Sequence, residues 1–518
     1  MVENTGIIIV TLELSPFFKV TGVGDLLHNI VAELARRQIP VTVICPDFGC
    51  EYPHLTFKKS LSFYSSIGGH ASPLQFRLAT DGRGVTYFFL KDKELELYLK
   101  NLPAEPSSEE TAKLCLEFCY GAYLVLEALS KGEFGFEGKD RLVVHAFHWQ
   151  TGPLLALMKQ ARWRHRIHTV LTVDILDKQG RFNPEVFEAH EIFHALRIRG
   201  DDEINFLRMG IETADVLHTV SPNYAREIQQ APYGRGLEGI LEQRYQEGRL
   251  LGILNGLDPV LSDWQCIPVL QENGLCIVPN NDQVLEHKRR AKLLFQKVAG
   301  LPADPEAFLI SMGHRFVTQK NFALVANAMD QLMALTPRPQ IYLRAWPEPA
   351  RRDQDQELWW QITRFSKRYR FHLAFLSPYD RDQALIPEGI FIDRFLYYAA
   401  SDLFLMPSLW EPCGLCQLEA MRFGAIPVVT AVGGLVDTVQ PVTGDNQGWG
   451  FRLDDPFDPQ GLVDAVQKAM HLKAAQPESW QGMVQKAMAF DSSIAHTVDS
   501  YIRFLYTPDL PVSSPSQS

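Results

Sequence analysis

The stretch WEPCGLCQLEAM, residues 410–421, holds two carboxylates, Glu411 and Glu419, on either side of two thiols, Cys413 and Cys416. These side chains could hold a metal ion, cycle a disulfide or bind a sugar. A zinc site needs about four ligands, usually including a second Cys or His pair, and no such close pair stands out elsewhere in the sequence. A thioredoxin-like role needs a small βαβ domain around the thiols, whereas this motif lies deep in a long chain. Two buried structural thiols are therefore the favoured interpretation of the cysteines.

The backbone around this stretch could present an anion site. An apolar run at 403–408 has the length of a strand, and a helical stretch follows the motif. Pro412 stops the helix from starting earlier, and Gly414 lets the backbone approach a ligand closely. The N–H groups of Cys413, Leu415 and their neighbours would then face that ligand. A neighbouring carboxylate is unfavourable for phosphate but accepts hydrogen bonds from sugar hydroxyls.

The elements that must position these residues alternate along the chain. Near-continuous apolar runs of strand length are separated by stretches with helical spacing, such as 25–37. This alternation predicts parallel sheets covered by helices on both faces. The predicted strands are 6–13, 41–46, 142–149, 167–174 and 214–221 in the first half, and 307–314, 340–346, 371–377, 403–408 and 426–432 in the second.

The chain of 518 residues is too long for one core, so two large domains are expected. The strand pattern falters at 258–285. We therefore predict two doubly wound α/β domains, 1–262 and 263–490, followed by a final helix at 491–507 and a disordered tail at 508–518. In open α/β sheets, ligands bind at the carboxyl ends of strands, often on helix N-termini. Motifs that follow strands are therefore the first candidates for function.

Composition narrows the class of partner. Apolar residues make up 46% and charged residues 21% of the chain, as in ordinary globular proteins. The formal charge of −11 argues against nucleic acid or an anionic membrane as the main partner. No apolar run reaches the roughly 18 residues of a membrane span, and the start lacks the basic region of a signal peptide. Eight cysteines are ordinary usage rather than a disulfide framework, so a cytoplasmic location is expected.

Together with VGGLVDTV downstream, the 410–421 motif resembles the nucleotide-sugar site of the bacterial glycogen synthase and plant starch synthase family. The resemblance covers most of the chain, in the family's order: KVTGVGDLLHNI, ADVLHTVSPNYAREI, GRGLEGILEQR, GILNGLD and HRFVTQKNFAL. It implies the GT-B fold, in which two Rossmann-like domains face an interdomain cleft and a final helix crosses back onto the first domain. It also implies transfer of glucose from the nucleotide sugar ADP-glucose to the non-reducing end of an α-1,4-glucan, glycogen or starch, with retention and without a metal cofactor.

The resemblance assigns roles to residues in each block. Three cations would bind the diphosphate and offset the charge of the leaving group: Lys19, Arg315 and Lys320. Other nucleotide-binding positions would include Gly22, Asp25, Asn255, Cys413, Gly414 and Leu415. Glu411 would accept hydrogen bonds from hydroxyls of the donor glucose. Glu419 has the spacing seen in related retaining transferases, in which the second glutamate binds the ribose. The predicted catalytic set is Arg315, Lys320, Glu411 and, at the donor sugar, Asp174.

A group of departures from the family's pattern clusters at positions expected to face the sugar or the phosphates. In the glycine loop, Val20 and Thr21 stand where the family has Thr and Gly. Further along the chain, Phe147 stands in place of His, His148 in place of Asp, Asp174 in place of His and Ile175 in place of Asn. A β-branched residue in the loop resists positive φ, which would weaken phosphate binding. Two interpretations follow: a working synthase with altered donor geometry, or a family member that has lost catalysis and acts by binding glucan or nucleotide. A third, suggested by Glu419, is a retaining transferase with another nucleotide sugar and a small acceptor.

Asp174 is the sharpest departure. At the carboxyl end of the predicted strand 167–174 it would face the donor sugar and place a negative charge near an anionic donor. That repulsion amounts to roughly 1–4 kcal/mol at 4 Å. We therefore expect Asp174→His to raise glucosyl transfer several-fold in steady-state kinetics, whereas a fall would show that Asp174 is a working replacement. The alternative is an N-cap or turn residue that points elsewhere.

Overall fold

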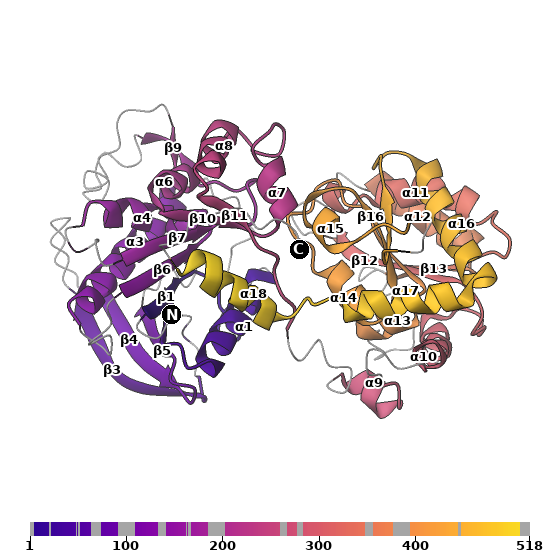
Figure 1. Cartoon of the computed structure of the whole chain (residues 1–518), viewed down its shortest axis with the longest axis horizontal. Helices are drawn as coiled ribbons and strands as arrows, with labels where there is room; N and C mark the ends of the chain where they lie inside the picture. The colour runs from indigo at the N-terminus through magenta and orange to yellow at the C-terminus, as the bar shows by residue number, and fades with distance from the viewer. Residues whose placement is uncertain are drawn as a thin grey trace. The chain divides into compact units, whose positions relative to one another are not determined.

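The computed structural model of the chain divides into two compact units (Figure 1). The first comprises Met1–Gly256 and Ile494–Ser518, and the second comprises Leu257–Ser493. The structure describes residues 5–19, 22–47, 49, 52–63, 74–91, 109–132, 141–161, 163, 167–184, 203–258, 267–276, 283–347, 356–376, 394–443 and 447–507. Residue 262, the predicted end of the first domain, and the predicted tail at 508–518 lie outside the described residues.

The first unit is built on a nine-stranded sheet with the order β11-β10-β7-β6-β1-β2-β5-β4-β3. Neighbouring strands from β11 to β5 pair in parallel, and β5, β4 and β3 pair antiparallel. The strands are β1 (Thr5–Val10), β2 (Val41–Pro46), β3 (Leu55–Phe63), β4 (Leu74–Asp81), β5 (Thr86–Lys91), β6 (Arg141–Phe147), β7 (Ile167–Thr172), β10 (Val216–Thr219) and β11 (Leu250–Gly252). A separate antiparallel pair joins β8 (Arg181–Phe182) to β9 (Ile204–Asn205).

The parallel strands β1, β2, β6, β7 and β10 follow the sequence prediction, because they are near-continuous buried runs, whereas β5 and β11 are not predicted. Every residue of β1 and β2 is buried. The sequence does not predict the antiparallel edge of the sheet. In β4, half-buried and exposed residues are interspersed with buried ones, so this strand lacks the continuous apolar run on which the prediction relied.

The final helix of the chain packs in the first unit. The helices of this unit are α1 (Gly22–Arg36), α3 (Glu109–Ser130), α4 (Gly152–Lys159), α6 (Phe206–Thr213), α7 (Pro222–Glu227), α8 (Glu238–Gln246) and α18 (Ile494–Ser500), which continues into a π-helical turn at Tyr501–Leu505. In Figure 1, α18 lies beside α1. There Arg37 donates to the backbone carbonyl of Ala495 at 3.0 Å and forms an ion pair with Asp499.

The second unit is built on a six-stranded parallel sheet with the order β14-β13-β12-β15-β16-β17. Its strands are β12 (Leu309–Phe316), β13 (Gln340–Pro347), β14 (Leu373–Leu376), β15 (Leu403–Met406), β16 (Ile426–Thr430) and β17 (Phe451–Leu453). The strand order reverses between β12 and β15, so the loops that follow these two strands lie next to each other.

The helices of the second unit separate these strands along the chain. They are α9 (Pro268–Glu272), α10 (Val284–Ala299), α11 (Phe322–Leu332), α12 (Gln356–Arg368), α13 (Arg394–Ala400), α14 (Cys416–Arg422), α15 (Gly433–Thr438), α16 (Pro459–Ala475) and α17 (Pro477–Ala489). Among the helices that the structure describes in either unit, none is long and apolar enough to cross a membrane.

A buried ion cluster ties helices of the second unit to its sheet. Asp402, just before β15, is 3% exposed and accepts hydrogen bonds from Lys292 and Lys473, each at 2.7 Å. The backbone N–H of Leu309 donates to the same carboxylate at 2.9 Å. Burial opposes the charged form, but the two lysines outweigh it and hold the pKa of Asp402 well below its ordinary value. The carboxylate therefore stays charged and links α10 and α16 to β12.

Asp402→Asn is expected to destabilise the second unit by about 3–5 kcal/mol, because Lys292 would be left buried without its counter-charge. The matched control Asp330→Asn removes an exposed carboxylate that lies 3.2 Å from Arg368, and this change should cost less than about 1 kcal/mol. Urea unfolding of both variants at pH 7 measures the difference. A loss at Asp402 no greater than the loss at Asp330 would contradict a stabilising role for the buried cluster.

Candidate active site

Lys320 and Glu411 meet where the strand order of the second sheet reverses. Lys320 ends the turn Thr318–Lys320 that follows β12, and Glu411 lies in the segment after β15. Lys320 Nζ forms an ion pair with Glu411 Oε2, and Ser408 Oγ donates to the same oxygen at 2.9 Å. The two charged side chains are only 11% and 10% exposed. The sequence prediction includes Lys320 and Glu411 but misses Ser408, although this residue ends the predicted strand 403–408.

Two glycines hold the backbone of Glu411 in place. α15 begins at Gly433, which has a φ of +45°, and the N–H of Gly434 donates to the carbonyl oxygen of Glu411 at 3.0 Å. A Cβ on Gly433 would lie 1.9 Å from that oxygen, and a Cβ on Gly434 would lie 2.3 Å from the carbonyl oxygen of Cys413. Because no larger residue fits this close approach, the two glycines of the VGGLVDTV motif serve the position of Glu411.

The turn before α14 presents backbone donors. Leu415 is the N-cap of α14 and has no side-chain acceptor, so it leaves the first N–H groups of the helix uncapped. Gly414 has a φ of +76°, and a Cβ there would lie 2.4 Å from Gln417 Oε1. Gln417 Nε2 donates to the carbonyl oxygens of Cys413 and Gly414 at 3.2 and 2.9 Å. These contacts fix the shape of the turn that the sequence assigns to the nucleotide.

Glu419 has a cationic partner that the sequence does not reveal. Its side chain is 10% exposed, and Oε1 lies 3.2 Å from an Nη atom of Arg394, the first residue of α13. Although burial opposes the charge, Glu419 raises the pKa of Arg394 above its ordinary value. No spacing signal marks Arg394 in the sequence, because it approaches Glu419 only through the packing of α13 against α14.

The thiols of this motif do not resemble metal ligands. Cys413 is 5% exposed, and burial raises the pKa of Cys416 to about 11. This burial agrees with the interpretation of the cysteines as structural thiols. Across the residues that the structure describes, no group of three or more His, Cys, Asp or Glu side chains is arranged to hold a metal ion.

Of the three cations predicted from the sequence, Arg315 and Lys320 lie in the second unit. Arg315 is an exposed residue near the end of the otherwise buried strand β12. The preceding His314 adds no charge at neutral pH, because burial lowers its pKa to about 3. The carboxylate of Glu411 offsets the charge of Lys320 in this structure. A phosphate would have to compete with the carboxylate for Lys320.

In the first unit, Lys19 and Asp25 lie between β1 and the first turn of α1. Lys19 Nζ forms an ion pair with Asp25, and Ser15 Oγ donates to the same carboxylate at 2.6 Å. Both charged side chains are about half exposed, at 52% and 46%. Gly22 begins α1, and a Cβ there would have no atom within 4 Å among those described. The predicted loop residues Lys19 and Asp25 are therefore in contact, and their pairing again balances a cation with a carboxylate.

His148 and Asp174 meet beyond the carboxyl ends of the adjacent strands β6 and β7. His148 Nδ1 lies 2.8 Å from Asp174 Oδ1, and the two side chains are 17% and 22% exposed. Burial lowers the pKa of His148, but the carboxylates of Asp174 and Glu13 outweigh it, so the pKa lies above its ordinary value. An imidazole therefore lies beside the carboxylate that the sequence places at the donor sugar.

Phe147 does not face a sugar, contrary to the sequence prediction. It is 1% exposed, and its ring stacks on that of His145 with the centroids 4.2 Å apart. Successive side chains of a strand point to opposite faces, and Phe147 points into the core that the final helix completes. Ile175 is half-buried. Val20 and Thr21, the departures in the glycine loop, lie outside the described residues.

Asn255 lies just after β11, and its side-chain oxygen is a hydrogen-bond acceptor. Its Oδ1 atom is buried and has no hydrogen-bond partner among the described residues. A buried acceptor without a partner is costly unless a ligand or a water molecule completes it. This geometry is compatible with the predicted ligand contact of Asn255.

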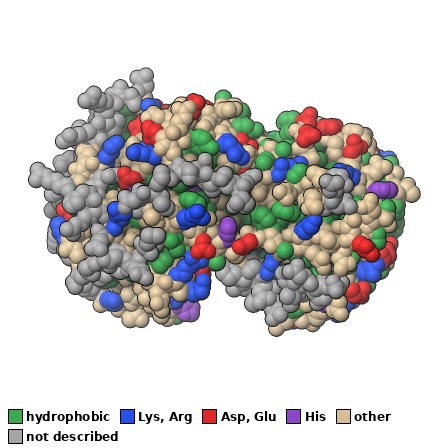
Figure 2. Space-filling view, viewed as in Figure 1, with side chains coloured by type: hydrophobic (Ala, Val, Ile, Leu, Met, Phe, Trp, Pro, Cys, Tyr) green, Lys and Arg blue, Asp and Glu red, His purple; other side chains and the backbone are tan. Residues whose placement is uncertain are grey.

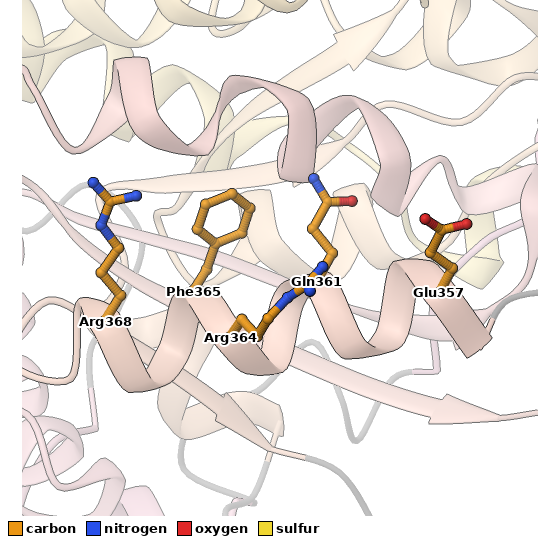
Figure 3. A pocket seen from close by; sticks show the side chains of 5 residues that line it. All are labelled: Glu357, Gln361, Arg364, Phe365 and Arg368. Atoms are coloured by element: carbon orange, nitrogen blue, oxygen red, sulfur yellow. The ribbon is translucent and has the colours of Figure 1, made fainter.

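A separate pocket of about 470 Å³ lies along α12 of the second unit. Figure 3 shows Glu357, Gln361, Phe365 and Arg368 pointing to the same side of this helix, and Arg364 completes the lining. None of the residues predicted from the sequence lines this pocket, so we do not assign the active site to it. On the face drawn in Figure 2, cationic and anionic side chains are interspersed rather than gathered into one basic patch.

Two family models match the sequence: the starch synthase catalytic domain over residues 6–243 and glycosyl transferases group 1 over residues 394–487. The chain is 32% identical to the glycogen synthase of Lactococcus lactis subsp. lactis over 507 residues, which cover 95% of this chain and 97% of the relative. It is 30% identical to the glycogen synthase of Clostridioides difficile over 511 residues, with 95% and 97% covered.

Solved structures show the same fold. The chain is similar to the catalytic domain of starch synthase IV from Arabidopsis thaliana bound to ADP and acarbose, with a TM-score of 0.73, 22% identity, and 96% of this chain and 98% of that chain covered. Its similarity to a sucrose-phosphate synthase from Thermosynechococcus elongatus has a TM-score of 0.55, 17% identity, and 97% and 99% covered. The fold is GT-B, with two Rossmann-like α/β domains.

Gly433→Ala is expected to destabilise the second unit by about 2–4 kcal/mol, because the methyl group would overlap the carbonyl oxygen of Glu411 and φ is positive. The matched control is Gly482→Ala in α17, where a Cβ meets no described atom within 4 Å. Alanine there should stabilise the helix by about 0.5–1 kcal/mol. Thermal unfolding of both variants measures the difference in their melting temperatures. Equal melting temperatures for the two variants would contradict the role given to Gly433.

Proposed function

Because the chain belongs to the glycogen synthase family of glycosyltransferases, we propose that it transfers glucose from ADP-glucose to the non-reducing end of an α-1,4-glucan. The bond between the anomeric carbon and the diphosphate breaks, a bond to the acceptor hydroxyl oxygen forms with retention, and ADP leaves and takes up the proton of that hydroxyl. The observation that carries this proposal is the match to glycogen synthases over 95% of the chain. The contacts of Lys320, Glu411 and Ser408 supply the chemistry of the transfer.

The cluster of Lys320, Glu411 and Ser408 supplies the donor side of the reaction. Lys320 and Arg315 can stabilise the negative charge that grows on the diphosphate as the glycosidic bond breaks. A phosphate oxygen draws Lys320 away from Glu411, whose carboxylate then accepts hydrogen bonds from glucose hydroxyls. Ser408 keeps its hydrogen bond to Glu411 Oε2, so the carboxylate remains oriented while Lys320 changes its partner.

The proposed reaction uses protein cations in place of a metal ion. In other enzymes a divalent metal ion stabilises the charge of a leaving phosphate. Here Lys320, Arg315 and the first N–H groups of α14, all in the second unit, take that role. The similar starch synthase IV was solved with ADP and acarbose, which supports an adenosine nucleotide as the leaving group and an α-glucan as the acceptor.

The decisive experiment measures incorporation of labelled glucose into glycogen by the purified full-length chain. We expect incorporation from ADP-glucose, a lower rate from UDP-glucose, and no change on addition of EDTA. If the protein incorporates no glucose beside an active control synthase, the proposed function is wrong. Incorporation from UDP-glucose alone would correct the donor, and an EDTA-induced loss that Mg²⁺ restores would overturn the metal-free mechanism.

Lys320→Ala is expected to lower kcat with ADP-glucose about 100- to 1,000-fold, because one preorganised contact to the leaving group is lost. Lys367→Ala, which removes an exposed lysine in the last turn of α12, should leave kcat unchanged. Steady-state kinetics of both variants, with thermal unfolding to confirm that each is folded, separate a local effect from lost stability. A folded Lys320→Ala variant with the wild-type kcat would contradict the assigned role.

A further inference from the structure

Another pocket lies in the first unit, and the proposed transfer does not use it. We propose that this pocket binds a short segment of α-1,4-glucan, in addition to the part of the glucan that accepts glucose. The inference rests on the proposed function, because that function supplies the glucan. It also goes beyond that function, because none of the candidate site residues that the structure describes lines the pocket.

Three separate segments of the first unit form this pocket. Phe17 comes from the loop after β1 and His28 from α1, while His54 lies just before β3 and Arg83 lies in the turn between β4 and β5. The volume is about 480 Å³. Small-molecule sites in proteins enclose roughly 300–1,000 Å³. The pocket is therefore large enough to hold part of an oligosaccharide.

Aromatic rings form one wall of the pocket. Phe17 packs edge-on against Tyr52 and Tyr87, with ring centroids 4.6 and 5.5 Å apart, and all three residues line the pocket. Phe89 supports them, because its ring stacks on that of Tyr87 with the centroids 5.7 Å apart. Rings that are already packed on one another lose little freedom when a ligand binds. A glucosyl residue presents C–H groups on the faces of its ring, and these groups gain free energy when they are buried against such a wall.

The polar groups of the pocket favour a neutral ligand over an anion. The side chain of Asp81 is 7% exposed and accepts hydrogen bonds from Arg83 Nε at 2.9 Å and from the Tyr87 hydroxyl at 3.2 Å. Because Asp81 offsets the charge of Arg83, a nucleotide or phosphate gains little attraction here. The ring nitrogens of histidine, supplied by His28 and His54, can donate or accept hydrogen bonds. This mixture of donors and acceptors suits the hydroxyl groups of a sugar.

An exposed aromatic side chain continues this surface beyond the pocket. Leu55 of β3 lines the pocket, and Phe57, two residues further along the strand, points to the same face of the sheet. The ring of Phe57 is 40% exposed and lies 6.3 Å from that of Phe89, centroid to centroid. The Arg77 guanidinium lies 4.6 Å from the same ring centroid. Since β3 is the last strand of the sheet (Figure 1), the surface follows the sheet edge, as a linear polymer requires.

A second contact with the acceptor distinguishes long glucans from short ones. When two sites bind one polymer, the second binding event becomes intramolecular, so the overall affinity exceeds that of either site alone. Glycogen can occupy both sites at once. Maltotriose is too short to do so and gains nothing from the pocket. Loss of the pocket should therefore affect glycogen and leave maltotriose unchanged.

The first test fills the pocket. Gly82 lines it, and a Cβ there would meet no described atom within 4 Å, so Gly82→Leu adds a bulky side chain without a backbone clash. We expect the KM for glycogen to rise about 10- to 100-fold, while kcat and the KM for maltotriose match the wild type. The control is Gly482→Leu in α17, where a Cβ also meets no described atom within 4 Å. Its kinetics should match the wild type with both acceptors.

The second test removes the exposed ring beside the pocket. Phe57→Ser should weaken binding of the full-length protein to glycogen about 10-fold, measured by co-sedimentation without a sugar donor. The control is Phe457→Ser in the second unit, where the side chain is 73% exposed, and its binding should match the wild type. Thermal unfolding confirms that both variants are folded.

Calorimetry with the full-length protein identifies the class of ligand. Maltoheptaose should bind to two sites on the wild type and to one site on Gly82→Leu. Cellopentaose, in which the glucose units are β-linked, should not bind to the pocket. If Gly82→Leu abolishes a binding site for ADP or for cellopentaose instead, the pocket does not select an α-glucan and the proposal is wrong.

The outcomes separate this inference from the proposed function. If the wild type incorporates no glucose but Gly82→Leu weakens its binding to glycogen, the proposed function is wrong and the pocket still binds glucan. If the wild type is active and the folded variants Gly82→Leu and Phe57→Ser both keep its affinity and KM for glycogen, only the inference is overturned. An equal rise in KM for maltotriose and glycogen would also overturn it, because the pocket would then belong to the transfer site.

Discussion

Parallel strands that are buried on both faces leave most of their polar side chains without access to water, so each buried one needs a partner inside the protein. Asp402 meets this constraint with Lys292 and Lys473. In the first unit, the buried ring of His145 contacts Thr172 Oγ1 at 2.6 Å, and the same hydroxyl contacts His218 Nδ1 at 2.8 Å. Groups that must meet a substrate are therefore confined to the ends of the strands, where the site residues of both units lie.

Near those ends, three cations among the described residues each form an ion pair with a carboxylate. Lys320 pairs with Glu411, Lys19 with Asp25, and Arg394 with Glu419. A half-buried cluster of uncompensated cations would be repulsive without a ligand. Pairing each cation with a carboxylate keeps it in place until a phosphate competes for it. In the proposed reaction, the carboxylate of Glu411 then becomes available to hydroxyl groups of the sugar.

The structure of the first unit shows the contacts that three of the departures from the family's pattern make. Phe147 belongs to the core, and its side chain stacks on His145. His148 and Asp174 are not separate losses, because they contact each other at 2.8 Å. In the family's pattern an Asp and a His occupy these two positions in the opposite order, so this chain keeps the two residue types and exchanges their places. The full-length similarity to glycogen synthases does not favour a purely regulatory role.

The α/β class and most of the parallel strands could be predicted from the sequence, because continuous apolar runs are local signals. Lys320 and Glu411 could be chosen as candidates because they follow predicted strands and keep the family's spacing. Which residues meet in space could not be predicted in this way. Arg394 reaches Glu419 through helix packing, and His148 reaches Asp174 because β6 and β7 are neighbours in the sheet. Such contacts join residues far apart in the sequence, and charge pairing depends on distance in space, which no local pattern encodes.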